Sequence, residues 1–226
     1  MTLNKSSLSP RLLDLPVEIL CLIMNHLGPE DLVALIEGRM VLVSVITTKH
    51  CSAQNAEGMT ILQLIARKER QEWMDMLVSR CANLSPRNHL YQTPLFLAVK
   101  EGNEPVVDMF LAAGAPVSVY SGTEHDDRRT SPLVAAVEVG NSAIIQMLLD
   151  KGANVAEEDS EGGQALWYAA RHGHADAVQL LIENGADMVD AGKKFCYSIV
   201  CRRLRVPYRS HPGANEERIQ LFDSGC

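Results

Sequence analysis

Two pairs of side chains in this sequence are of types that bind metals. His172 and His174 are two residues apart, and Cys196 and Cys201 are five apart. Imidazole nitrogens and thiolates are ligands that Zn²⁺ prefers in proteins. However, residues two apart on a helix do not share a face, and the cysteines have no second pair at a zinc-ligand spacing. We therefore expect ordinary helix-end histidines and free thiols, with no metal site.

The sequence also lacks the motifs of the common enzyme classes. It contains no Gly-x-Ser-x-Gly nucleophile, no phosphate-binding loop, no His-Glu-x-x-His and no Gly-x-Gly-x-x-Gly. We expect no enzymatic activity and no cofactor. The basic run at 202–205 could be a nuclear address or touch nucleic acid, but a net charge of −7 is unsuited to general phosphate binding. We expect a solvated segment there and no nucleic-acid partner.

Composition favours packed helices. Of the 226 residues, 46% are hydrophobic and only 5% are aromatic, whereas sandwiches and barrels use more aromatic and β-branched residues. The most apolar early stretch, 12–27, is interrupted by Asp14, Glu18, Asn25 and His26, so we expect no membrane span and no signal peptide. The six cysteines are scattered, which predicts unpaired thiols in a reducing compartment, the cytoplasm or the nucleus.

Four segments of the sequence align with one another. Each carries an anchor leucine, and these leucines are 33, 38 and 33 residues apart, so the middle gap is one period plus five inserted residues. Such self-similarity is typical of stacked repeats. The anchors are Leu62, Leu95, Leu133 and Leu166, within segments 58–84, 91–117, 129–155 and 162–188.

Residues at fixed offsets from the anchors predict two short helices in each unit. Thr93-Pro94 and Ser131-Pro132 suit a helix start, because the hydroxyl caps the first turn and proline needs no hydrogen-bonded N–H there. One glycine after the first helix and another after the second predict the two helix ends. These glycines are Gly102, Gly140 and Gly173, then Gly114, Gly152 and Gly185. We expect Leu95, Leu133 and Leu166 to be buried, together with the small residues Ala98, Ala136 and Ala169.

The period, the Thr-Pro-Leu start and the glycine pattern together resemble the ankyrin repeat family over 55–188. The resemblance implies an all-α, L-shaped solenoid of eight antiparallel helices in four pairs, joined by β-hairpin-like turns. The expected repeats are 55–87, 88–120 with an insertion to 125, 126–158 and 159–191.

Two departures from the family pattern stand out. The first repeat has Ile65 in place of a small residue, and Glu69 and Cys81 in place of the two glycines. The histidine that usually follows Thr-Pro-Leu is also replaced, and we expect this to remove a hydrogen bond between neighbouring hairpins. The replacing residues are Gln63, Phe96, Val134 and Trp167.

After a flexible segment at 1–11, residues 12–51 predict a small helical module. Its order Leu-Pro-x-Glu-Ile-Leu resembles the F-box, especially the F-box that precedes ankyrin repeats in many fungal proteins, although 37–51 lacks the usual Arg- and aromatic-rich third helix. The alternative is a helical cap. A cap would bury the apolar face of 12–36 on the first repeat, whereas a docking module would leave it exposed. The resemblance implies that a Skp-family linker subunit binds Leu15, Pro16, Ile19, Leu20 and Ile23.

Beyond the fourth repeat, 192–212 is basic and lacks the repeat pattern, while Gly213 and Gly225 are again twelve apart. We expect 192–226 to be a degenerate fifth repeat or a poorly ordered tail, and a gene-model artefact stays open.

The ankyrin resemblance also implies a partner-binding surface on the concave face and the hairpins. The five-residue insertion lies within 118–125. We expect it to place Tyr120 on a longer finger, and Tyr120 and Arg128 to be partner contacts. The full set is Arg67, Lys68, His89, Leu90, Gln92, Lys100, Glu101, Tyr120, Asp127, Arg128, Thr130, Glu138, Val139, Ser160, Glu161, Arg171 and His172.

Two functions follow from these resemblances. In the first, the chain is a substrate adaptor of an SCF-type ubiquitin ligase, with the F-box on the linker subunit and the ankyrin stack on the substrate. In the second, it is a plain ankyrin scaffold or regulator whose N-terminal helices only cap the solenoid. Both imply protein partners, no membrane and a chain that is monomeric by itself.

Overall fold

The computed structural model describes residues 24, 26–38, 46, 48–67, 71–81, 83–122, 129–160 and 162–187. These ranges hold no strand, only two isolated bridges, Ser121–Thr130 and Glu158–Gln164. None of their helices is long and apolar enough to cross a bilayer. The helices are α2 (Pro29–Gly38), α3 (Thr48–Ser52), α4 (Ile61–Ala66), α5 (Gln71–Arg80), α6 (Pro94–Lys100), α7 (Glu104–Ala112), α8 (Pro132–Val139), α9 (Ser142–Asp150), α10 (Ala165–His172) and α11 (Ala175–Glu183).

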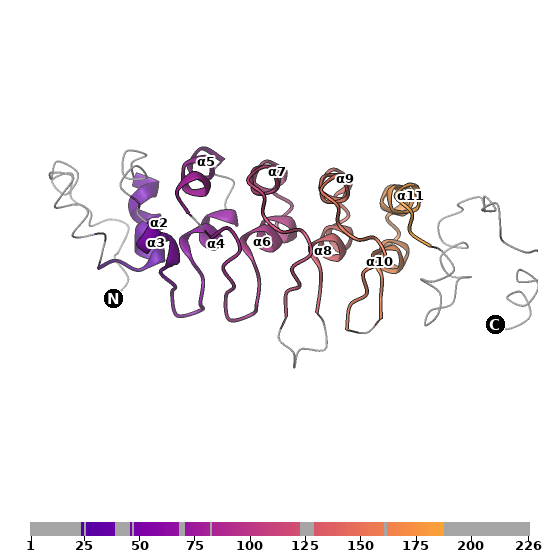
Figure 1. Ribbon diagram of the computed structural model, residues 1–226, viewed down its shortest axis with the longest axis horizontal. Helices are drawn as coiled ribbons and strands as arrows, with labels where there is room; N and C mark the ends of the chain where they lie inside the picture. The colour runs from indigo at the N-terminus through magenta and orange to yellow at the C-terminus, as the bar shows by residue number, and fades with distance from the viewer. Residues whose placement is uncertain are drawn as a thin grey trace, which may run out of the picture.

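From α4 onward the helices form four pairs stacked side by side (Figure 1). The first helices of the pairs, α4, α6, α8 and α10, form one row, and α5, α7, α9 and α11 form a second row above it. The turns between pairs project from the first row, away from the second. Each helix packs on its partner and on its equivalent in the next pair, which is the packing of a solenoid.

The predicted helix ends are confirmed where the local chemistry is strongest. Thr93 Oγ1 accepts a hydrogen bond from the Phe96 N–H at 3.2 Å, and Ser131 Oγ accepts one from the Val134 N–H at 3.3 Å. Pro94 and Pro132 are the first residues of α6 and α8.

The core runs through the whole stack. Leu95, Leu133 and Leu166 are buried, and Ala98, Ala136 and Ala169 have no exposed surface, as predicted. Leu62, the anchor of the first repeat, is buried as well. The alanines lie on α6, α8 and α10, where a larger side chain would separate neighbouring first-row helices.

One sequence expectation is wrong in the first repeat: a side chain does tie neighbouring hairpins there. Gln63 is fully buried and its Nε2 donates to the carbonyls of Pro86 and Gln92, at 3.2 and 2.6 Å. Its Oε1 accepts from the Thr60 N–H at 2.8 Å. The glutamine amide offers both a donor and an acceptor, so it can cap α4 and reach the next repeat at once.

A second expectation, that the cysteines stay unpaired, is wrong for two of the six. Cys51, in α3, forms a disulfide with Cys81, just after α5, with a Cα–Cα distance of 5.5 Å. The two residues are 30 apart in sequence, but α3 packs on α5 and brings them together. Cys81 occupies a repeat position where the other repeats have glycine. The cysteine that replaces this glycine therefore forms a covalent link to α3.

The N-terminal helix α2 lies beside the first repeat and packs on α4 (Figure 1). Leu32 and Val33 are buried in this contact, and Met24 is buried as well. Asn55 Nδ2, in the first hairpin, donates to Glu30 Oε1 at 2.6 Å. Within 29–34, the apolar face is therefore used to cover the end of the stack.

Candidate protein-binding surface

Some predicted site residues lie outside the described part of the chain. They include all five linker-binding residues, Leu15, Pro16, Ile19, Leu20 and Ile23. Lys68, Asp127, Arg128 and Glu161 of the partner-binding set are also outside it, as are Cys196, Cys201 and residues 192–226. Their roles stay predictions.

Six of the remaining residues gather around one cavity between the second and third repeats. We call it the Leu90–Val139 notch, and its volume is about 440 Å³. It lies between the second hairpin, the ends of α6 and α8, and the base of the third hairpin. Its lining residues are Leu90, Gln92, Phe96, Lys100, Ser121, Gly122, Thr130, Ala135, Glu138 and Val139.

The notch has an apolar floor and apolar rims. Phe96 and Ala135 are buried at its base. Leu90 and Val139 are 56% and 44% exposed, and with Tyr91 they are the large apolar side chains most open to solvent in the described residues. Two of these three, from different repeats, thus border the same cavity. Clustered exposed apolar side chains are typical of interaction sites.

The hairpin that presents Leu90 is held by its own hydrogen bonds. Asn88 Oδ1 accepts from the backbone N–H groups of Leu90 and Gln92, at 3.0 and 2.8 Å. The Leu90 carbonyl accepts from the Gly122 N–H at 3.0 Å, which joins this hairpin to the next one. The backbone at Leu90 is therefore fixed before any partner arrives, so little backbone entropy is lost when this residue is covered.

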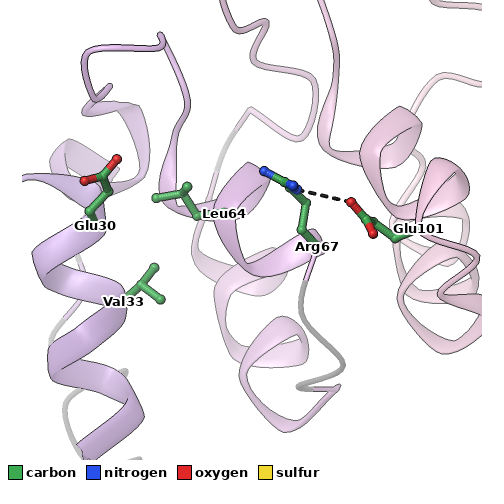
Figure 2. Close-up of a pocket in the computed structure, with 5 residues that line it drawn as sticks. All are labelled: Glu30, Val33, Leu64, Arg67 and Glu101. Atoms are coloured by element: carbon green, nitrogen blue, oxygen red, sulfur yellow. Dashed lines mark hydrogen bonds and ion pairs between the residues drawn. The ribbon is translucent and has the colours of Figure 1, made fainter. Parts of the chain in front are cut away.

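A second cavity, of about 370 Å³, lies between α2 and the first two repeats (Figure 2). Val33 and Glu30 come from α2, Leu64 and Arg67 from the end of α4, and Glu101 from the end of α6. Arg67 Nε and Glu101 Oε1 are 3.2 Å apart. These two predicted site residues are exposed and face one another across the repeat boundary (Figure 2).

Tyr120 lies at the base of the third hairpin rather than at its tip. It directly precedes the Ser121–Thr130 bridge and is half-buried. The Arg129 guanidinium is 4.8 Å from its ring centroid. The pKa of Tyr120 is raised to about 12, mainly by burial and then by its hydrogen bond to the Glu157 carboxylate, while Arg129 acts in the opposite direction. Tyr120 thus links the third hairpin to the fourth.

Neighbouring hairpins are linked at other points too. The Arg129 N–H donates to Ser160 Oγ at 3.1 Å. The His89 N–H donates to the Glu57 carbonyl at 3.1 Å, and the imidazole of His89 lies against Gly58.

Arg171 and His172 belong to a separate cluster on α10. The Arg171 guanidinium is 5.0 Å from the Trp167 ring centroid. The His172 ring stacks on those of Tyr168 and His174, with centroids 6.5 and 5.9 Å apart. In the described ranges, no three His, Cys, Asp or Glu side chains gather as ligands for a metal ion.

Sequence reasoning missed the residues that form the floor and one wall of the notch. These are Phe96, Ala135, Ser121 and Gly122. The sequence suggests that both Phe96 and Ala135 belong to the core. Phe96 directly follows the anchor Leu95, and Ala135 follows the apolar pair Leu133-Val134. A signal was available in Phe96, which replaces a histidine of the family pattern with a larger apolar ring.

Two family models match the chain. A model of ankyrin repeats in three copies matches residues 116–191, and a model of a single ankyrin repeat matches 91–121. Residues 91–191 therefore carry ankyrin repeats. The helix pair α4–α5 precedes the matched region and packs on α6 and α7 as the later pairs pack on one another. A search of curated proteins found no match.

Proposed function

We propose that this chain is a protein-binding scaffold whose partner contacts the face bearing the Leu90–Val139 notch. Ankyrin repeats are modules of protein–protein interaction, and the matched region contains every lining residue of this notch except Leu90, which directly precedes it. The observation that carries the proposal is the convergence of Leu90 and Val139, both strongly exposed and from different repeats, on one cavity. Covering them would remove apolar surface from water at about 25 cal/mol per Å².

The experiment compares capture by two variants that differ only in the face they alter. The first carries Leu90→Ser and Val139→Ser at the notch. The matched control carries Ala112→Ser and Ala143→Ser, which are exposed positions on the second-row helices α7 and α9. Proteins captured from cell extract by wild-type chain and by each variant are identified by mass spectrometry, and thermal unfolding is followed by circular dichroism.

We expect the notch variant to lose partners that the wild-type chain and the control variant both retain, with all three unfolding at similar temperatures. If the control variant loses those partners instead, the binding face is the second helix row and the proposal is wrong.

A second candidate is the substrate-adaptor role in an SCF-type ubiquitin ligase. It is favoured by the order Leu15-Pro16-x-Glu-Ile-Leu20, which resembles an F-box. The burial of Leu32 and Val33 against the first repeat supports the capping alternative for α2. The two roles are compatible if 12–23 binds the linker subunit while α2 closes the stack.

The test of this second role uses purified linker subunit and two variants. Ile19→Glu alters the predicted docking residues, whereas Leu32→Ala alters the contact of α2 with the stack. An adaptor would lose linker binding with Ile19→Glu at an unchanged unfolding temperature. Absence of linker binding by the wild-type chain would leave the scaffold role standing and remove the adaptor role.

A further inference from the structure

We infer that the Leu90–Val139 notch binds a segment of a partner protein that inserts an apolar side chain next to a carboxylate. The inference rests on the proposed scaffold function and names the chemistry of the partner. It comes from comparing equivalent positions in successive repeats.

The first link between repeats is an ion pair. Arg67 follows its anchor by five residues, Glu101 follows the next anchor by six, and their charged atoms are 3.2 Å apart. The pair crosses from the end of α4 to the end of α6 (Figure 2).

At the next repeat boundary, the acidic residue of the equivalent ion pair is missing. Lys100 is the equivalent of Arg67, and Val139 is the equivalent of Glu101. Both line the notch, and Val139 Cγ1 lies 3.8 Å from the point where a Cβ on Gly102 would be, next to the end of α6. A valine thus occupies the place from which a carboxylate would reach the lysine.

The result is a cation without a counter-ion beside an apolar surface. Lys100 is exposed and forms no ion pair with the described residues. A carboxylate supplied by a partner would complete the link that the repeats make between Arg67 and Glu101. The apolar side chain beside it would cover Leu90 and Val139, so both halves of the notch would be used.

Glu138 also lines the notch and would favour a basic partner residue. By the same register, however, Glu138 is the equivalent of Arg67 and Lys100, and the position it would link to in the next repeat is His172. The equivalent position in the next repeat is thus polar for Glu138, whereas for Lys100 it is the apolar Val139. The favoured partner charge is therefore negative.

The probes are three fluorescein-labelled synthetic peptides of one length with a central leucine. The leucine is flanked on both sides by glutamate in the first, by glutamine in the second and by lysine in the third. Binding to the full chain is measured by fluorescence polarisation at low ionic strength. We expect the glutamate peptide to bind about two- to fivefold more tightly than the glutamine peptide, which is the range of an exposed ion pair, and the lysine peptide to bind most weakly.

Three variants test which side chain is responsible for the preference for the glutamate peptide. Lys100→Gln should abolish the preference for glutamate over glutamine and keep binding of the glutamine peptide. Val139→Glu introduces the carboxylate that Glu101 provides at the first boundary, so it should weaken binding of the glutamate peptide most. Glu138→Gln is the matched control and should keep the preference.

Equal binding of the three peptides, no binding of any, or a preference that survives Lys100→Gln would overturn the inference. A preference for the lysine peptide that is lost with Glu138→Gln would assign the charge to Glu138 and overturn it as well. If partner capture depends on Leu90 and Val139 while the peptides show no acidic preference, the scaffold function stands and only the partner chemistry is wrong.

Discussion

At the scale of single residues, the amide of Gln63 shows how a repeat can lose a family residue and keep its interaction. Its Nε2 donates to the carbonyls of Pro86, just before the second repeat, and Gln92, within it, and its Oε1 accepts from the Thr60 N–H at the start of α4. An apolar replacement at this buried position leaves those groups without partners, and each buried unsatisfied group costs about 1–3 kcal/mol.

Gln63→Ala should therefore lower the free energy of unfolding by about 2–4 kcal/mol. Gln54→Ala is the matched control, because Gln54 Nε2 also donates to a backbone carbonyl distant in sequence, that of Arg87, but is exposed. The control should cost about 0.5 kcal/mol or less. Urea unfolding of both variants measures the difference, and equal costs would mean that burial of Gln63 does not matter.

Tyr120 has a hydroxyl whose ionisation reports the contact between hairpins. Its pKa is raised to about 12, so the folded chain keeps this proton while an unfolded tyrosine loses it near pH 10. Between these values the folded state binds more protons than the unfolded state. The contribution of Tyr120 is fully present below pH 10 and falls as the pH rises toward 12.

We expect the difference in ultraviolet absorbance between the wild-type chain and Tyr120→Phe to show Tyr120 ionising near pH 12. Glu157→Gln should move this ionisation to lower pH, since the carboxylate helps to raise the pKa. A difference that titrates near pH 10, the value of an unperturbed tyrosine, would contradict the raised pKa.

At the scale of helices, the ends of α8 and α10 provide a matched pair of glycines. Gly140 and Gly173 both cap their helices in the left-handed conformation, with φ of 77° and 80°. A Cβ on Gly140 would lie 2.5 Å from the His174 ring, whereas one on Gly173 would meet nothing within 4 Å.

Alanine at either position should cost about 1 kcal/mol for the left-handed backbone. Gly140→Ala should cost more than Gly173→Ala, because His174 must also move. When His174→Ala is added to each variant, the two glycine substitutions should lower the free energy of unfolding by similar amounts. Identical unfolding midpoints for the two single variants would indicate that the imidazole shifts freely.

The disulfide between α3 and the end of α5 joins the helices before the stack to its first repeat. Closing a loop of this length constrains the unfolded chain by about 3–4 kcal/mol in the chain-entropy description. Oxidised wild-type chain should therefore unfold at a higher urea concentration than the reduced chain, and Cys51→Ser should unfold like the reduced chain under both conditions. Peptide mapping without reductant should recover the peptides of Cys51 and Cys81 as one linked species, and recovery of both thiols free would contradict the pairing.

These elements differ in how far the sequence determines them. The starts of α6 and α8 could be predicted because Thr93-Pro94 and Ser131-Pro132 act within one turn. The link made by Gln63 and the Cys51–Cys81 bond could not, since each joins residues brought together only by packing. Leu90 and Val139 were placed on one face by the repeat register. The notch between them also depends on Ser121 and Gly122, which lie in the stretch 118–125 that contains the insertion.

At the scale of the whole molecule, the ion pair that links the first and second repeats has no equivalent between the second and third repeats. Arg67 and Glu101 close the first boundary, while Lys100 and Val139 leave the second open over buried Phe96 and Ala135. A solenoid held by contacts between neighbouring repeats can tolerate such a break, because each boundary contributes largely on its own. The central claim is that a partner protein fills this opening.

Site-specific photocrosslinking tests that claim most directly. A photoreactive phenylalanine analogue is placed at Val139, beside the notch, or at Ala143, exposed on α9 of the second helix row. After irradiation in cell extract, we predict a discrete protein adduct with the probe at Val139, none with the probe at Ala143, and loss of the adduct when Leu90→Ser is added. An adduct of the same mass from Ala143 alone would contradict the account.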